Sequence, residues 1–150
     1  WPHALRLLLG GGPPDVVGLS AAAGACAGGA WALAAWLLGS AESWRVRPNS
    51  FTYLSAIDAC AGEGQWEQGL GAFADMRCRD AGGGVHHCGA LIKACEKARQ
   101  QWGAALAVLG EMRRAHIQAN LIPCNAAISA CEQGQGWLHA LQVLCGLGCD

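Results

Sequence analysis

Charged residues are scarce in this chain. They make up 14% of its 150 residues, and ten basic residues against eleven acidic ones give a net charge of -1 at pH 7. The chain therefore lacks the strong excess of basic residues that is typical of nucleic-acid-binding proteins. Its 53% hydrophobic content excludes a disordered, highly charged tail. The 22 glycines follow no Gly-X-Y period, which excludes collagen and indicates many short turns.

The chain also lacks the usual signatures of metal sites and active sites. None of its nine cysteines forms a Cys-x-x-Cys pair, and the group His86-His87-Cys88 with Cys95 has no second pair of ligands, so we expect the two histidines at an exposed helix start. The odd number of cysteines in an apolar chain argues against a disulfide framework, so we expect buried, unpaired thiols. We find no phosphate loop and no Ser-His-Asp order. We therefore expect no enzyme, no metal and no cofactor.

One uncharged stretch, Val16–Ala41, is long enough to span a bilayer. It consists mostly of alanine and glycine, however, and Gly28-Gly29 lies in its middle. A Gly-Gly pair favours a turn, so we expect two short helices here rather than one transmembrane helix.

The chain repeats itself. Four segments of similar pattern end in Ala-Cys, at Cys26, Cys60, Cys95 and Cys131. A tryptophan follows each of these cysteines after five to seven residues, at Trp31, Trp66, Trp102 and Trp137. The first three tryptophans each lie 29 residues before the next of these cysteines, which gives a period of 34 to 36 residues.

Each period has the pattern of two amphipathic helices. In the first, Cys88, Leu91, Ile92 and Cys95 are spaced i, i+3, i+4 and i+7. In the second, the stripe begins at the tryptophan. A single helical hairpin cannot bury both stripes, whereas stacked hairpins can. The pattern predicts an all-α fold, an α-solenoid of stacked helix–turn–helix repeats, with the isoleucines Ile57, Ile92 and Ile128 buried beside the repeated cysteines.

The period also predicts the repeat boundaries. We expect repeats at 16–49, 50–84 and 85–120, an incomplete repeat at 121–150, and the end of a truncated preceding repeat at 1–15. On this interpretation the chain is a fragment of a longer array.

The units resemble pentatricopeptide repeats, most visibly over Asn49–Cys60, Ala105–Arg113 and Asn125–Glu132. The resemblance implies binding of single-stranded RNA in a chloroplast or mitochondrion, in RNA processing, stabilisation or editing, with one base read per repeat. A helical scaffold for protein partners, without RNA specificity, is the alternative that the sequence leaves open.

The resemblance also implies roles for individual positions. Bases would be read from inside the first helix of each repeat by Ser20, Leu54, Gly89 and Asn125, and from the end of each linker by Asp15, Asn49, Gly84 and Asn120. Residues expected to pack against bases are Val17, Phe51, His86 and Ile122. Lys97 matches a phosphate-contacting position.

Several of these positions depart from the family pattern. Ser20 with Asn49 resembles an adenine-type pair, although Asn49 also suits a helix cap. Leu54 and Gly89 offer no side-chain hydrogen bonds to a base. Gly28, Gly62 and Gln133 stand at the positions equivalent to Lys97, which leaves the expected phosphate track nearly empty.

Overall fold

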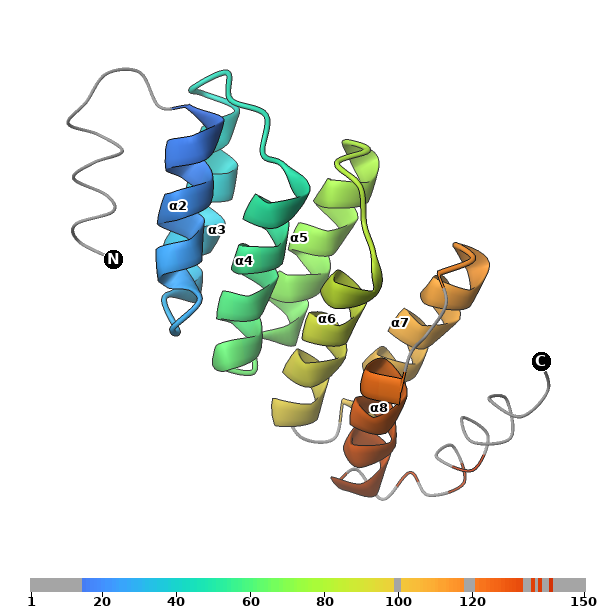
Figure 1. The fold of residues 1–150 in the computed structure, drawn as a ribbon. Helices are drawn as coiled ribbons and strands as arrows, with labels where there is room; N and C mark the ends of the chain where they lie inside the picture. The colour runs from blue at the N-terminus through green and yellow to red at the C-terminus, as the bar shows by residue number, and fades with distance from the viewer. Residues whose placement is uncertain are drawn as a thin grey trace.

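The computed structural model describes residues 15–98, 101–117 and 121–133, together with Gly136, Leu138 and Leu141. Every regular element in these residues is an α-helix, which confirms the predicted all-α class (Figure 1). The helices are α2 (Val16–Cys26), α3 (Trp31–Ala41), α4 (Ser50–Gly62), α5 (Trp66–Cys78), α6 (Val85–Lys97), α7 (Trp102–Arg114) and α8 (Leu121–Gln133). The expected preceding repeat lies outside the described residues, apart from Asp15.

The helices form two layers (Figure 1). The first helices, α2, α4, α6 and α8, pack directly against one another in chain order. The second helices, α3, α5 and α7, lie behind them, and each contacts the first helix before it and the first helix after it. This arrangement is the predicted α-solenoid, in which each hairpin covers the apolar face of its neighbour.

The uncharged stretch Val16–Ala41 folds as two helices, α2 and α3, as expected. The turn between them includes Gly29, whose φ of 117° is a conformation that glycine adopts readily. None of the described helices is both long and apolar enough to cross a membrane.

The repeated cysteines lie in the core. Cys26, Cys60, Cys95 and Cys131 are buried and unpaired, which confirms the prediction for their register. Their companions Ile57 and Ile92 are fully buried. The expectation that Ile128 is equally buried is wrong: its side chain is half-buried, since only α6 and α7 of the described helices pack against α8.

Trp31, Trp66 and Trp102 are each the first residue of a second helix, as the period predicts. All three are half-buried and pack against the core. Trp137 lies outside the described residues.

The three second helices end in the same way. Arg45, Asp80 and His116 have φ values of 56°, 50° and 53°, in the left-handed region. The amide of the following residue then donates to a carbonyl five residues back, as in Val46 to Ala41 at 2.9 Å and Ala81 to Met76 at 3.1 Å. This is the Schellman arrangement. It turns the chain sharply from the second layer into the linker that leads to the next first helix.

Candidate nucleic-acid interface

A row of exposed side chains runs across the first-helix layer. Val17, Phe51, His86 and Ile122 are each the second residue of their helix, so they occupy the same register in four helices that pack side by side. Three of them are large apolar side chains that are mostly exposed, with exposed fractions of 74% for Val17, 57% for Phe51 and 71% for Ile122. A packing role inside the protein does not account for these three side chains in this register.

The structure brings Ser20 and Asn49 together. The Ser20 Oγ lies 3.3 Å from Asn49 Oδ1 and 2.9 Å from Thr52 Oγ1. Asn49 caps α4, because its Oδ1 accepts from the Thr52 amide at 2.8 Å and from the Thr52 hydroxyl at 2.9 Å. The three bonds to Asn49 all engage the oxygen of its carboxamide, which leaves its NH₂ group for an acceptor from outside. The cap predicted at Asn49 is thus confirmed.

Gly84, the predicted linker position before α6, has no side chain to cap that helix. His87 fills this role, because its Nδ1 accepts from the Gly84 amide at 3.3 Å while its Nε2 donates to the Ser50 carbonyl at 3.0 Å. His87 is therefore buried, whereas the adjacent His86 lies on the surface of the hollow described below. The expectation of an exposed helix start is wrong for His87.

The remaining predicted reading positions differ in their surroundings. Asp15 caps α2 by accepting from the Gly18 amide at 2.6 Å. Leu54 is half-buried and packs against the core, Gly89 lines the hollow described next, and Asn125 is exposed on α8. Asn120 lies outside the described residues.

A hollow of about 230 Å³ opens between α4, α6 and α8 on the same face. Its lining includes the predicted positions Leu54, His86, Gly89 and Ile122. It also includes Asp58 and Lys93, which had no assigned role in the sequence. The hollow is smaller than the roughly 300–1,000 Å³ typical of small-molecule sites.

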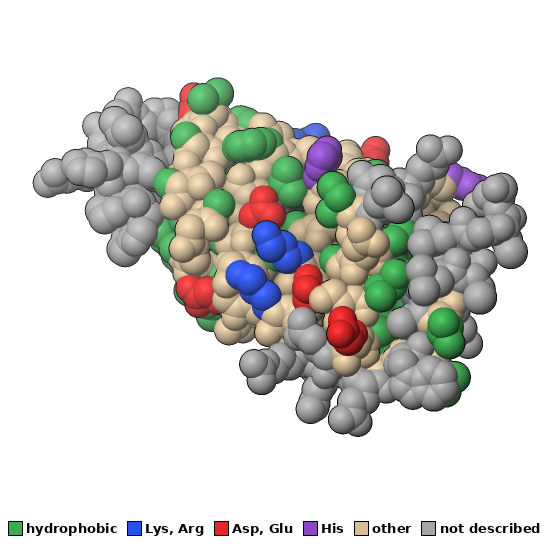
Figure 2. All heavy atoms as spheres, turned by 60° about the horizontal axis from the view of Figure 1, so that its bottom comes forward, with side chains coloured by type: hydrophobic (Ala, Val, Ile, Leu, Met, Phe, Trp, Pro, Cys, Tyr) green, Lys and Arg blue, Asp and Glu red, His purple; other side chains and the backbone are tan. Residues whose placement is uncertain are grey.

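The cations of this face are few, and one of them is engaged. The Lys97 Nζ donates to the Gly62 carbonyl at 3.0 Å, at the carboxyl end of α4. In Figure 2 basic side chains lie next to acidic ones rather than forming a continuous basic track. The surface therefore offers local charges and not a general attraction for phosphate.

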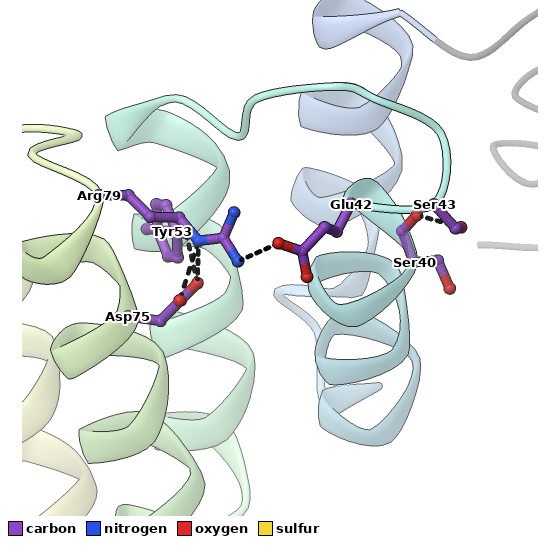
Figure 3. A network of polar contacts seen from close by, with 6 residues as sticks. All are labelled: Ser40, Glu42, Ser43, Tyr53, Asp75 and Arg79. Carbon is purple, nitrogen blue, oxygen red and sulfur yellow. Dashed lines mark hydrogen bonds and ion pairs between the residues drawn. The ribbon is translucent and has the colours of Figure 1, made fainter.

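A polar network joins α4 and α5 of one hairpin to the end of α3 in the preceding hairpin (Figure 3). The Tyr53 hydroxyl donates to Asp75 Oδ2 at 2.6 Å, and the Arg79 Nε donates to the two Asp75 oxygens at 2.9 and 3.0 Å. Burial acts to raise the pKa of Asp75, but the hydrogen bonds from Tyr53 and Arg79 outweigh it and hold that pKa below its ordinary value. Arg79 also lies 3.6 Å from Glu42. These groups have structural partners.

Within the described ranges no group of three or more His, Cys, Asp and Glu side chains is placed to hold a metal ion. The six buried cysteines are instead single thiols among apolar neighbours. Burial raises the pKa of Cys60, Cys88 and Cys95 from an ordinary 9.0 to about 11.

Comparison with known proteins gives a structural match but no sequence match. No protein-family model matches the chain, and no curated protein does. Solved structures similar to it include the pentatricopeptide repeat protein PPR10 in complex with an 18-nt psaJ RNA element, and a triple Cys-to-Ser variant of PPR10 in complex with the same element. For each, the TM-score is 0.71 and the identity 25%, over 92% of this chain and 20% of the other. The present chain thus spans about a fifth of the length of those proteins.

Proposed function

Because the chain is built of pentatricopeptide repeats, we propose that its first-helix face binds single-stranded RNA, as a module of an organellar protein that processes, stabilises or edits RNA. The proposed role is binding rather than catalysis. The observation that carries it is the hydrogen-bonded pair Ser20–Asn49, which lies at the same end of the layer as the exposed side chains of Val17 and Phe51.

These four residues have the chemistry of a slot for one base. Val17 and Phe51 come from neighbouring helices, α2 and α4, and offer apolar surface to the two faces of a base. Ser20 and Asn49 would meet its edge. Because the Asn49 oxygen already accepts from the Thr52 amide and hydroxyl, its NH₂ group is the part that would donate to adenine N7 or N1. Adenine is therefore the base that we propose for this slot.

The remaining slots follow from the proposed repeat boundaries at 16–49, 50–84 and 85–120. Phe51 and His86 would flank a second base, with Leu54 and Gly84 at its edge. His86 and Ile122 would flank a third, with Gly89 and Asn120. Neither of these two bases would meet a pair of polar side chains such as Ser20 and Asn49, since leucine and glycine side chains form no hydrogen bonds. Asn125 would begin a fourth slot and Asp15 would close the one before the first.

The alternative function is a scaffold for a protein partner. The same exposed residues, Phe51, Ile122 and Val17, could pack against an apolar peptide, and the net charge of -1 gives RNA little long-range attraction. RNA and peptide binding differ in which side chains they need. Only base recognition needs the Ser20–Asn49 pair to present hydrogen bonds.

The test is a binding series of the full chain, and of a longer array in which further repeats are fused to it, against single-stranded RNA pools with double-stranded DNA as the control. We expect the 150-residue chain to bind RNA with micromolar or weaker affinity and a shallow salt dependence, since it has few cations. Phe51→Ala should weaken binding, because base stacking is worth about 1–3 kcal/mol per base.

The matched control is Trp36→Ala. Trp36 is exposed to a similar degree, 50% against 57% for Phe51, but it lies on α3 in the second layer. An equal loss of RNA binding in both variants would contradict a first-helix interface. Absence of any RNA preference in the longer array would favour the protein scaffold.

A further inference from the structure

The hollow between α4, α6 and α8 owes its depth to Gly89. A Cβ atom at this position would meet only Pro123 Cγ, at 4.0 Å. Without a side chain there, the surface continues down α6 by one helical turn, to Lys93. Asp58 of α4 lines the same hollow.

Asp58 and Lys93 occupy one register in neighbouring helices, two residues before the buried Cys60 and Cys95. The same register holds Gly24 in α2 and Ser129 in α8, and the Ser129 hydroxyl is already bonded to Glu96 Oε1 at 2.6 Å. Of the four described first helices, α4 and α6 therefore place one acid and one base in this register, and both side chains line the hollow.

We infer that this hollow is a guanine-selective pocket, in which Asp58 and Lys93 read the edge of an RNA base held between His86 and Ile122. The inference rests on the proposed binding of RNA, and it deepens that proposal by assigning a base to a slot whose predicted reading position, Gly89, has no side chain.

Guanine is the base that complements an acid and an amine together. Its Watson–Crick edge carries two adjacent donors, N1–H and N2–H₂, next to the acceptor O6. A carboxylate can accept both donors at once, and a lysine ammonium donates to O6. Adenine, cytosine and uracil each lack two adjacent donors, so they would form at most one hydrogen bond to each of the two side chains.

The electrostatics of the hollow favour a neutral donor edge over an anion. A phosphate beside Lys93 would also face the Asp58 carboxylate, and the two negative charges would repel each other. Burial raises the pKa of Asp58, although Lys93 and His87 act in the opposite direction. A carboxylate forms charge-assisted bonds with N–H donors that are stronger than hydrogen bonds between neutral groups.

The experiment is an NMR titration of the full 150-residue chain with the four nucleoside 5′-monophosphates, which share one phosphate and differ only in the base. We expect GMP to shift the amide resonances of Gly89 and Lys93 and to bind there about fivefold or more tightly than AMP, the low end of the discrimination that a bidentate pair provides. Asp58→Asn and Lys93→Met should each remove most of that preference. Gly89→Leu should abolish binding at this site for all four nucleotides.

Arg113→Met is the matched control, since it removes a cation at the end of α7, outside the hollow. Equal affinity for the four nucleotides, shifts confined to other residues, or a GMP preference that survives in Asp58→Asn and Lys93→Met would overturn the guanine assignment. Binding of single-stranded RNA is measured on the same samples. A chain that prefers GMP but does not bind single-stranded RNA would refute the proposed function alone. RNA binding without GMP selectivity would refute the pocket alone.

Discussion

Lys97 of α6 donates a hydrogen bond of 3.0 Å to the carbonyl of Gly62, the last residue of α4. The ammonium group thus lies at the carboxyl end of the preceding first helix, where the helix dipole favours a cation and where carbonyls lack helical partners. Because Lys97 also matches a phosphate-contacting position by resemblance, one side chain would serve two purposes, the joining of neighbouring hairpins and the binding of RNA.

Lys97→Ala should therefore have an effect even without RNA. We expect the free energy of unfolding to fall by about 0.5–1 kcal/mol, as the bond to the helix end and the favourable charge are lost. Binding to all RNA sequences should weaken about equally, since a phosphate contact carries no base information. Urea denaturation and binding to RNA pools measure the two effects.

Lys97→Arg keeps both the charge and a donor, so it should retain most of the stability and the affinity. A Lys97→Ala chain as stable as the parent would show that the bond to Gly62 contributes nothing in solution.

Asn49→Asp separates the two roles of Asn49. An aspartate caps a helix as well as an asparagine does, so its oxygen can still accept from the Thr52 amide and hydroxyl. It has no NH₂ group, however, so the proposed donation to adenine is lost. We expect the free energy of unfolding to change by less than about 0.5 kcal/mol, while the preference for adenine at one position of the RNA disappears.

Asn49→Ala is the comparison for this variant, because it removes the cap as well and should destabilise the fold by about 1 kcal/mol. Selection from an RNA pool with the longer array measures the base preference. An unchanged preference in Asn49→Asp would leave Asn49 with the role of a cap only.

The helices and their order could be predicted from the sequence because buried residues recur at the same position of each repeat. The buried Cys60 and Cys95 recur at the register that faces the core, and Trp66 and Trp102 begin second helices after short turns. Such positions depend on contacts within one hairpin and its neighbours, and each repeat presents the same pattern again.

The contacts that cross between repeats could not be predicted in this way. The burial of His87 follows from the missing side chain at Gly84 and from the nearby Ser50 carbonyl, which belongs to another repeat. The hollow at Gly89 likewise depends on the distance between α4, α6 and α8. Local patterns carry no signal for either feature, since both are set by how the hairpins dock.

The buried thiols should resist alkylation. In the folded chain burial raises the pKa of Cys60, Cys88 and Cys95 to about 11. Since the thiolate is the reactive form and these side chains are also inaccessible, labelling at about pH 8 should require opening of the fold. Cys78 is exposed at the end of α5 and serves as the internal reference. We expect peptide mapping by mass spectrometry to find Cys78 alkylated long before these three, and equal rates would contradict the assigned core.

Two glycines of α5 should respond in opposite ways to the same change. A Cβ atom at Gly69 would lie 3.0 Å from Leu91 Cδ2 and 3.6 Å from Cys60 Cβ, whereas at Gly71 it would meet no atom within 4 Å. Leu91 is fully buried and cannot move aside freely. Alanine gains about 0.5–1 kcal/mol over glycine inside a helix, but overpacking a core typically costs about 1–3 kcal/mol.

Gly71→Ala should therefore raise the free energy of unfolding by about 0.5–1 kcal/mol, and Gly69→Ala should lower it by about 1 kcal/mol. Both substitutions are measured by urea denaturation, and because they lie two residues apart in one helix, the difference between them reports on packing rather than on helix propensity. Equal stabilisation by the two alanines would mean that α5 does not approach α6 as closely as the contact between Gly69 and Leu91 requires.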